Sequence, residues 1–191
     1  MNNIAIFASG SGTNAENIIR YFNFHPQKGA KVVMLYANKP EVYALIRAKK
    51  LGVPTHVFDR DTFYSSNEIL AELNRLEVAL IVLAGFLWLM PHNIVEAFPN
   101  KIVNVHPALL PKFGGKGMYG MNVHKAVKEA GERETGITVH YVNKEYDSGS
   151  IIFQAKCSVE KSDSPEAIAE KIHLLEQENF PRTVEEVLHK I

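Results

Sequence analysis

Short apolar runs alternate with amphipathic stretches along the first half of this chain, and that alternation constrains the fold more than any other feature of the sequence. The runs Ile4–Ala8, Lys31–Ala37 and Leu80–Ala84 are rich in Val, Ile, Leu and Ala, as in strands covered on both faces. Between them, stretches such as Ser66–Leu76 place apolar residues at helical spacing. This pattern predicts βαβ units in an α/β fold: a mixed, mainly parallel, doubly wound sheet flanked by helices.

The second half of the chain has a different pattern. Two β-rich runs, Gly136–Val142 and Ser150–Val159, are joined by a turn-like stretch around Asp147. A final helix is expected, with Ser164 as its N-cap and Pro165 at its first position. Further strands are expected at Thr55–Phe58 and Ile102–His106, and further helices around Ile18, at Val42–Leu51, at Asn93–Phe98 and near Val123–Ala130. No linker or repeat divides the 191 residues, so we expect a single domain over residues 1–191.

Composition and charge narrow the class of protein. Twenty-one Lys and Arg balance twenty-one Asp and Glu, which argues against a strongly basic nucleic-acid binder. The single cysteine, Cys157, excludes an internal disulfide framework and a multi-cysteine zinc site. The longest apolar stretch, Val78–Met90, is shorter than the roughly 20 residues that cross a bilayer. With no evident signal peptide, we expect a cytoplasmic protein without nucleic-acid or membrane partners.

The segment Gly10–Ala15 follows the first expected strand and opens a helix. Glycines let the backbone approach a ligand, and a helix N-terminus offers free N–H groups, both suited to a phosphate. The segment also fits the dinucleotide pattern G-x-G-x-x-G/A, which expects an acid at the end of the second strand. No acid follows that strand before Glu41, so a phosphomonoester is favoured over a dinucleotide. Residues 1–106 thus have the pattern of a Rossmann-like nucleotide-binding half; a tight turn without a ligand is the structural alternative.

A second candidate is Asn104-Val105-His106-Pro107. Residues two apart on a strand point to the same side, so Asn104 and His106 project together at the carboxyl end of the fifth expected strand. An amide beside an imidazole can stabilise an oxyanion and move a proton. The structural alternative is a pair of strand-end residues that satisfy the following loop.

Two further residues belong to the same argument. Asp147 would raise the pKa of a nearby imidazole, although Asp in an Asp-Ser-Gly turn is common for local reasons. His140 alternates with Val139 and Tyr141 and is a possible site residue. The other histidines show no metal-ligand spacing, and most are expected at the surface: His25, His56, His92, His124, His173 and His189.

Four motifs together resemble the phosphoribosylglycinamide formyltransferases, folate-dependent enzymes of purine synthesis. They are Gly-Ser-Gly-Thr-Asn at 10–14, Leu-Ala-Gly-Phe at 83–86, Asn-Val-His-Pro-Ala-Leu-Leu-Pro-Lys at 104–112 and Tyr-Asp-Ser-Gly at 146–149. The resemblance runs from about Ile4 to Pro181. It implies transfer of a formyl group from the co-substrate 10-formyltetrahydrofolate to the amine of glycinamide ribonucleotide, without a metal. Residues 107–191 would then supply the folate-site loops, two strands and the C-terminal helix.

The resemblance also implies residue roles. His106 would be the acid that assists a tetrahedral intermediate, Asn104 would hold its oxygen, and Asp147 would keep His106 protonated. The ribonucleotide would be bound by Gly12, Thr13, Asn14, His173 and Glu176. The folate would contact Asn104 and residues of two loops: Leu87, Trp88, Leu89, Met90, Asn143, Lys144, Glu145, Tyr146 and Asp147.

Three departures from the pattern of relatives bear on the folate side, and one on the phosphate side. An Arg near Ser66 is absent, Trp88 stands where some members have Arg, and the glycine-rich loop 113–120 is longer than usual. His173 occupies a position where relatives vary among polar or basic residues.

Four alternatives remain at the level of sequence. A formyltetrahydrofolate hydrolase normally carries an additional N-terminal domain, and a methionyl-tRNA formyltransferase a C-terminal one with a basic surface. A nucleotide-sugar formyltransferase fits the chemistry less well because of the glycine motif. A non-catalytic dinucleotide-binding module would leave Asn104, His106 and Asp147 without a role.

Overall fold

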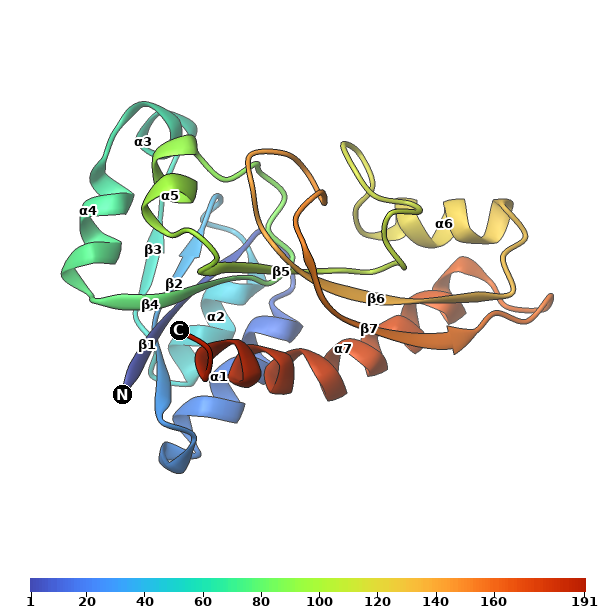
Figure 1. The fold of residues 1–191 in the computed structure, drawn as a ribbon, viewed down its shortest axis with the longest axis horizontal. Helices are drawn as coiled ribbons and strands as arrows, with labels where there is room; N and C mark the ends of the chain where they lie inside the picture. Colours follow the sequence, from blue (N-terminus) through green and yellow to red (C-terminus); the bar gives the residue numbers. More distant parts are fainter.

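A computed structural model describes all residues, 1–191, and shows one twisted sheet with helices on both of its faces (Figure 1). The sheet has seven strands in the order β3-β2-β1-β4-β5-β6-β7. The parallel strands are β1 (Asn2–Ala8), β2 (Ala30–Ala37), β3 (Thr55–Val57), β4 (Val78–Leu83) and β5 (Ile102–His106). The antiparallel strands are β6 (Glu134–Tyr141) and β7 (Ile151–Ser158). The expectation of a mixed, mainly parallel sheet is confirmed.

The helices lie close to the expected positions, with two additions. They are α1 (Thr13–Asn23), α2 (Tyr43–Lys50), α3 (Arg60–Ser65), α4 (Glu68–Arg75), α5 (His92–Ala97), α6 (Met121–Glu129) and α7 (Pro165–Leu188). Helix α3 and a 3-10 turn at Pro26–Lys28 were not predicted from the sequence. Asp59 was the available signal for α3, because its carboxylate caps the helix by accepting the backbone N–H of Thr62 at 2.8 Å.

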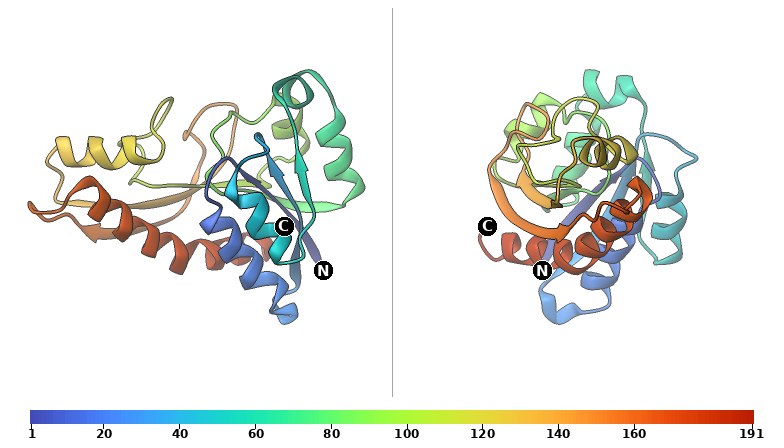
Figure 2. Two further views of the ribbon diagram at one scale, coloured as in Figure 1. Left: turned by 180° about the vertical axis from the view of Figure 1, so that it is seen from behind. Right: turned by 90° about the vertical axis from the view of Figure 1, so that its right-hand side faces the viewer.

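The alternation of side chains along β1 explains why the strand is apolar throughout. Ile4, Ile6 and Ala8 pack on one face with α1, α2 and α7, whereas Ala5 and Phe7 pack on the other face with α3, α4 and α5. All five are fully buried. The two layers of helices lie on opposite sides of the sheet in both views from front and back (Figures 1 and 2).

Helix α7 connects the two halves of the fold. It packs against β6, β7 and α6 and also reaches α1 (Figure 2). As predicted, Ser164 caps it by accepting the N–H of Ala167, and Pro165 occupies its first turn.

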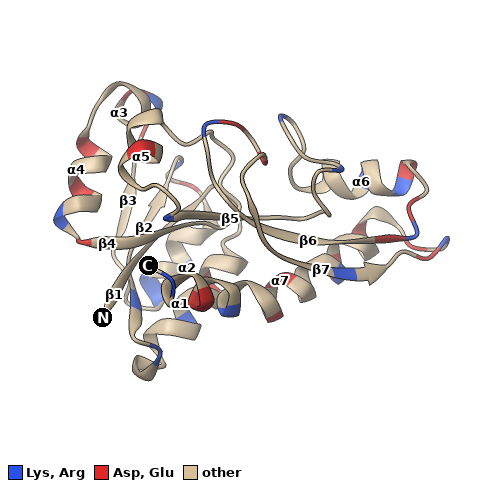
Figure 3. Ribbon diagram, viewed as in Figure 1, with Lys and Arg blue, Asp and Glu red and all other residues tan.

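No helix, α7 included, has the length and apolar character needed to cross a membrane. Charges of both signs are interspersed along the chain (Figure 3). The expected division of one domain at residue 106 coincides with the end of the parallel strands and stays a prediction.

Candidate active site

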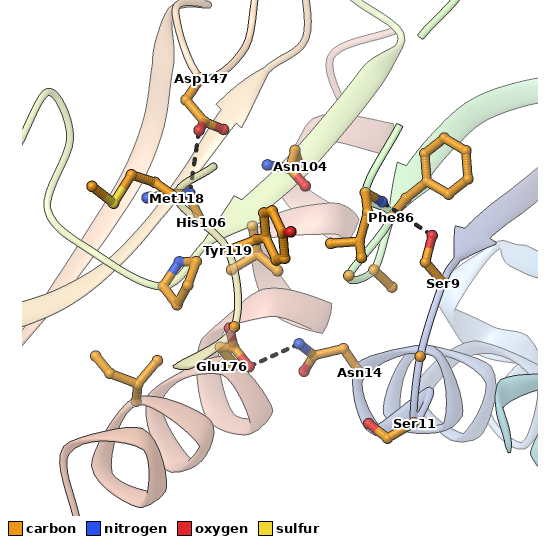
Figure 4. A pocket seen from close by; sticks show the side chains of 18 of the residues that line it. Ser9, Ser11, Asn14, Phe86, Asn104, His106, Met118, Tyr119, Asp147 and Glu176 are labelled. Carbon is orange, nitrogen blue, oxygen red and sulfur yellow. Dashed lines mark hydrogen bonds and ion pairs between the residues drawn. The ribbon is translucent and has the colours of Figure 1, made fainter. Parts of the chain in front are cut away.

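A cavity of about 830 Å³ opens at the carboxyl ends of β1, β4 and β5 (Figure 4). Strand order reverses between β1 and β4, and open α/β sheets bind ligands at such a switch point. Segments distant in sequence line the cavity: 9–14, 84–87, 104–107, 115–120, 146–147 and the face of α7 around Ile172. The glycine segment and the Asn-x-His segment therefore belong to one site.

Asn104 and His106 lie side by side because β5 places alternate residues on one face. In the antiparallel register with β6, Asn104 lies opposite His140 and His106 opposite Thr138. The Asn104 side-chain amide contacts Nε2 of His140 at 3.1 Å. Nδ1 of His140 is 2.8 Å from the Tyr141 carbonyl and donates its hydrogen to that oxygen. The second N–H of the Asn104 amide has no partner in the protein and is free to serve a ligand.

The turn after β6 brings Asp147 to His106. Oδ2 of Asp147 is 3.5 Å from Nδ1 of His106, and Oδ1 is 3.6 Å from Nε2 of His140. The backbone N–H of Gly115 donates to Oδ2 at 2.9 Å. Gly149 closes the turn where a Cβ would collide with the carbonyl oxygen of Tyr141. Sequence spacing did not decide whether Asp147 meets His106; in the structure the two side chains are in contact (Figure 4).

Both ring nitrogens of His106 face acceptors. Nε2 donates to the carbonyl of Phe113 at 2.8 Å, and Nδ1 faces the Asp147 carboxylate. The pKa of His106 nevertheless lies below its ordinary value, because burial outweighs the attraction of Asp147. Asp147 favours the protonated form of His106, and desolvation of a ring only 3% exposed acts in the opposite direction with the larger effect. The role of Asp147 in keeping His106 protonated stays a prediction.

Asp147 itself is held as a carboxylate. Burial raises its pKa, but the contact with His140, the charge of His106 and the Gly115 N–H together hold the pKa below the usual range. Asp147 also has a left-handed backbone, with φ of 52°.

The other end of the cavity is formed by α1 and α7. Gly12 is the N-cap of α1 with a left-handed φ of 75°, and Thr13 begins the helix. The side-chain amide of Asn14 donates to Oε2 of Glu176 at 2.8 Å, which joins α1 to α7 (Figure 4). The same carboxylate oxygen is 3.7 Å from Nδ1 of His173. The contact with Glu176 raises the pKa of His173, so a cation is favoured at this end.

The residues expected to bind folate divide into two groups. Leu87, Tyr146 and Asp147 line the cavity with Asn104. Six others lie outside its lining: Trp88, Leu89, Met90, Asn143, Lys144 and Glu145. Met90 is only 3% exposed and packs in the core beside α5. The backbone N–H of Leu87 donates to the Ser9 hydroxyl at 3.0 Å, which ties this loop to the glycine segment.

Two residues of the site region were missed from sequence. His124 was expected at the surface, but it is 6% exposed, lines the cavity from α6, and its Nδ1 has no partner. Burial lowers its pKa. The helical spacing of His124 with Val123 and Val127 on a half-buried helix was the available signal.

Arg60 is the second missed residue. Its guanidinium lies 5.3 Å from the ring centres of both Tyr64 and Trp88. The Tyr64 hydroxyl donates to the carbonyl of Leu89 at 2.9 Å. The Arg60 cation, packed on two aromatic rings, therefore lies beside the 87–90 segment. It lies in the region where the sequence lacks the Arg that relatives carry near Ser66. No signal in the sequence distinguished Arg60 from other surface arginines.

No group of three or more His, Cys, Asp or Glu side chains is arranged to hold a metal ion. The polar groups of the cavity are hydrogen-bond donors, acceptors and two imidazole–carboxylate pairs, His106–Asp147 and His173–Glu176. This set suits acyl-group chemistry, in which an oxyanion and a proton must be handled.

The chain is similar over nearly its whole length to proteins of one family. The sequence profile of the family described as formyl transferase matches residues 2–184. A phosphoribosylglycinamide formyltransferase of Haemophilus influenzae is 37% identical over 188 residues, which cover 96% of this chain and 86% of that protein. The chloroplastic phosphoribosylglycinamide formyltransferase of Arabidopsis thaliana is 41% identical over 88% of this chain, but the chain spans only 59% of that protein.

Among solved structures, a phosphoribosylglycinamide formyltransferase from Bacillus halodurans superposes with a TM-score of 0.87 at 34% identity. The superposition covers 99% of this chain and 96% of that structure. The chain therefore belongs to the phosphoribosylglycinamide formyltransferase family.

Proposed function

We propose that this protein transfers the formyl group of 10-formyltetrahydrofolate to the amine of glycinamide ribonucleotide, a step of purine biosynthesis. The observation that carries the proposal is the convergence of Asn104, His106 and Asp147 in the same cavity as the glycine turn and Glu176. One end of that cavity handles an oxyanion and a proton, and the other suits a phosphate. This combination is what a phosphorylated amine acceptor requires.

The residues at the transfer end have separable roles. In the reaction the amine nitrogen forms a bond to the formyl carbon, and the bond from that carbon to the donor nitrogen breaks. Negative charge develops on the formyl oxygen, which the free N–H of Asn104 and a protonated His106 would stabilise. One proton leaves the amine and one reaches the donor nitrogen, and Asp147 would favour the protonated form of His106 during that exchange.

For His106 to reach the formyl oxygen through Nε2, its hydrogen bond to the Phe113 carbonyl has to be exchanged for one to substrate. The loop that contributes Phe113 also contributes Gly115, which donates to Asp147. A movement of this loop would therefore change the hydrogen bonds of both His106 and Asp147.

The ribonucleotide end uses backbone and side-chain groups of two helices. Gly12, Thr13 and Asn14 would bind the phosphate at the N-terminus of α1, assisted by the His173 cation. Glu176 would accept hydrogen bonds from the ribose hydroxyls. Its contact with Asn14 fixes the distance between the two binding groups.

The folate side has an apolar wall with an arginine beside it. Leu87 and Tyr146 line the cavity there, and Arg60 stands on the rings of Tyr64 and Trp88. A folate carries carboxylates on its glutamate tail, and Arg60 would pair with them. The partners we propose are thus small molecules, the ribonucleotide and the folate.

The test is the absorbance change that accompanies conversion of 10-formyltetrahydrofolate to tetrahydrofolate, with and without glycinamide ribonucleotide. Turnover only with the ribonucleotide, together with a formylated product, is the expected result. Equal turnover without the ribonucleotide would indicate a hydrolase. No turnover by folded protein, together with binding of a nicotinamide cofactor, would favour a binding module.

A further inference from the structure

We infer that Arg47, a residue of α2 outside the cavity, positions the backbone of the glycine turn so that its amides face the substrate phosphate. The inference rests on the proposed function for the identity of the phosphate, but its geometry concerns the turn alone. Arg47 is a positioning residue, because it acts through the backbone of Ser11 and does not line the cavity.

Two donors of α2 hold two successive carbonyl groups of the turn. The backbone N–H of Ala44 donates to the carbonyl of Gly10 at 3.2 Å. Nε of Arg47 donates to the carbonyl of Ser11 at 2.9 Å. Ser11 and Gly12 line the cavity, whereas Ala44 and Arg47 do not, so the carbonyls are turned away from the cavity, toward α2.

This arrangement also sets the direction of the amides. In a planar trans peptide the C=O and the N–H of the next residue point in opposite directions. With the Gly10 and Ser11 carbonyls directed at α2, the N–H groups of Ser11 and Gly12 point away from α2. These N–H groups are donors for an anion at the N-terminus of α1.

The turn and α2 are also in close steric contact. A Cβ on Gly12 would lie 2.5 Å from Cα of Ala44, and the φ of Gly12 is 75°. Only glycine fits a position that is both left-handed and this close to a neighbouring helix. The carbonyl of Gly12 in turn accepts the N–H of Glu16 at 2.8 Å as α1 begins. The turn therefore has little freedom between α1 and α2.

Arg47 is itself fixed by neighbours on both helices. Its Nη1 contacts Oε2 of Glu16, and its guanidinium lies 4.8 Å from the ring centre of Tyr43. Its charge also acts on His173, whose pKa it lowers against the larger, raising effect of Glu176. A planar guanidinium can serve the Ser11 carbonyl and the Glu16 carboxylate together, which the single ammonium of a lysine cannot reproduce.

The test compares Arg47→Met with Arg20→Met. Arg20 also pairs with Glu16, through Oε1 at 2.8 Å, but it is exposed and makes no contact with the turn. Arg47→Met is expected to raise the KM for glycinamide ribonucleotide about tenfold while the KM for the folate changes less than twofold. Arg20→Met is expected to leave both KM values within about twofold. Arg47→Lys keeps the positive charge but not the planar guanidinium with its several N–H donors. It is expected to raise the KM for glycinamide ribonucleotide by less than Arg47→Met does.

Isothermal titration with ribose 5-phosphate separates this inference from the proposed function. About tenfold weaker binding by Arg47→Met than by Arg20→Met supports the positioning role, even if the wild-type protein shows no formyl transfer. Equal ribose 5-phosphate affinity in wild-type and Arg47→Met protein overturns it, even if formyl transfer is found. Equal increases in both KM values would also overturn it, because they would indicate a general loss of structure, which the melting temperatures of the three variants would register.

Discussion

The side-chain amide of Asn14 donates a 2.8 Å hydrogen bond to the carboxylate of Glu176, although 162 positions separate the two residues in the chain. Asn14 lies in the first turn of α1 and Glu176 in the middle of α7. The contact exists because α7 returns beneath the sheet to pack against α1. It joins the phosphate end of the cavity to the C-terminal part of the chain.

Glu176→Gln is expected to raise the KM for glycinamide ribonucleotide about tenfold, because a hydrogen bond to a carboxylate is stronger than one to an amide. It is also expected to lower the pKa of His173, since Glu176 is the largest cause of its raised value. Steady-state kinetics and NMR titration of His173 would measure the two effects. Glu178→Gln, on the exposed face of the same helix, is the matched control. An unchanged His173 titration would contradict the contact.

His106→Asn and Asp147→Asn are each expected to lower kcat by about 100- to 10,000-fold, the usual range for loss of an acid–base group. Ribonucleotide binding is expected to change little, because Gly12 and Glu176 lie at the other end of the cavity. Single-turnover rates and calorimetric titration with the ribonucleotide would separate the two quantities. A loss of affinity as large as the loss of rate would be inconsistent with these roles.

The free energy of unfolding is expected to fall as the pH is lowered from about 6.5 to about 5. The pKa values of His106 and His124 are lowered by burial, so the unfolded chain, with histidine pKa values near 6.5, binds more protons than the native chain in this window. Protonation therefore favours unfolding. His173, whose pKa is raised, contributes stability that is lost only as the pH rises through its native pKa, so its transition lies above this window.

Urea unfolding at a series of pH values would measure that dependence. Lowered carboxylate pKa values, such as that of Asp147, affect stability only at lower pH, because the unfolded carboxyl pKa lies near 4. His124→Asn is expected to reduce the slope between pH 5 and about 6.5, because it removes one of the two buried histidines. A native chain that gains stability on acidification in this window would show that desolvation does not dominate at His106 and His124.

Arg60→Ala is expected to raise the KM for 10-formyltetrahydrofolate severalfold and to leave the KM for the ribonucleotide unchanged. The reason is the loss of a cation held on the Tyr64 and Trp88 rings beside the folate segment. A formyl donor that lacks the glutamate carboxylates should be used equally well by wild-type and variant protein. Arg182→Ala, exposed on α7, serves as the control. A loss of the same size with both donors would assign Arg60 a role in packing.

Several features of the fold could be predicted from local sequence. The apolar run of β1 and the N-cap at Ser164 were recognised within a residue or two, because they depend on burial pattern and backbone chemistry close in sequence. The short helix α3 was missed because its six residues are too few to show periodicity. His124 was misplaced because its burial depends on α6 packing against α7, a contact between distant segments.

For the site, the sequence by itself determined which chemical groups are present and which pairs share a strand face. Asn104 and His106 had to project together, because strand geometry alternates side chains. Only the tertiary structure decided that Asp147 meets His106, that Asn14 meets Glu176, and that α2 holds the glycine turn. It also set the environment of His106, where burial lowers the pKa by more than the Asp147 carboxylate raises it. Distances between distant segments, and the desolvation that follows from them, arise from the packing of the whole chain and are not encoded in any local pattern.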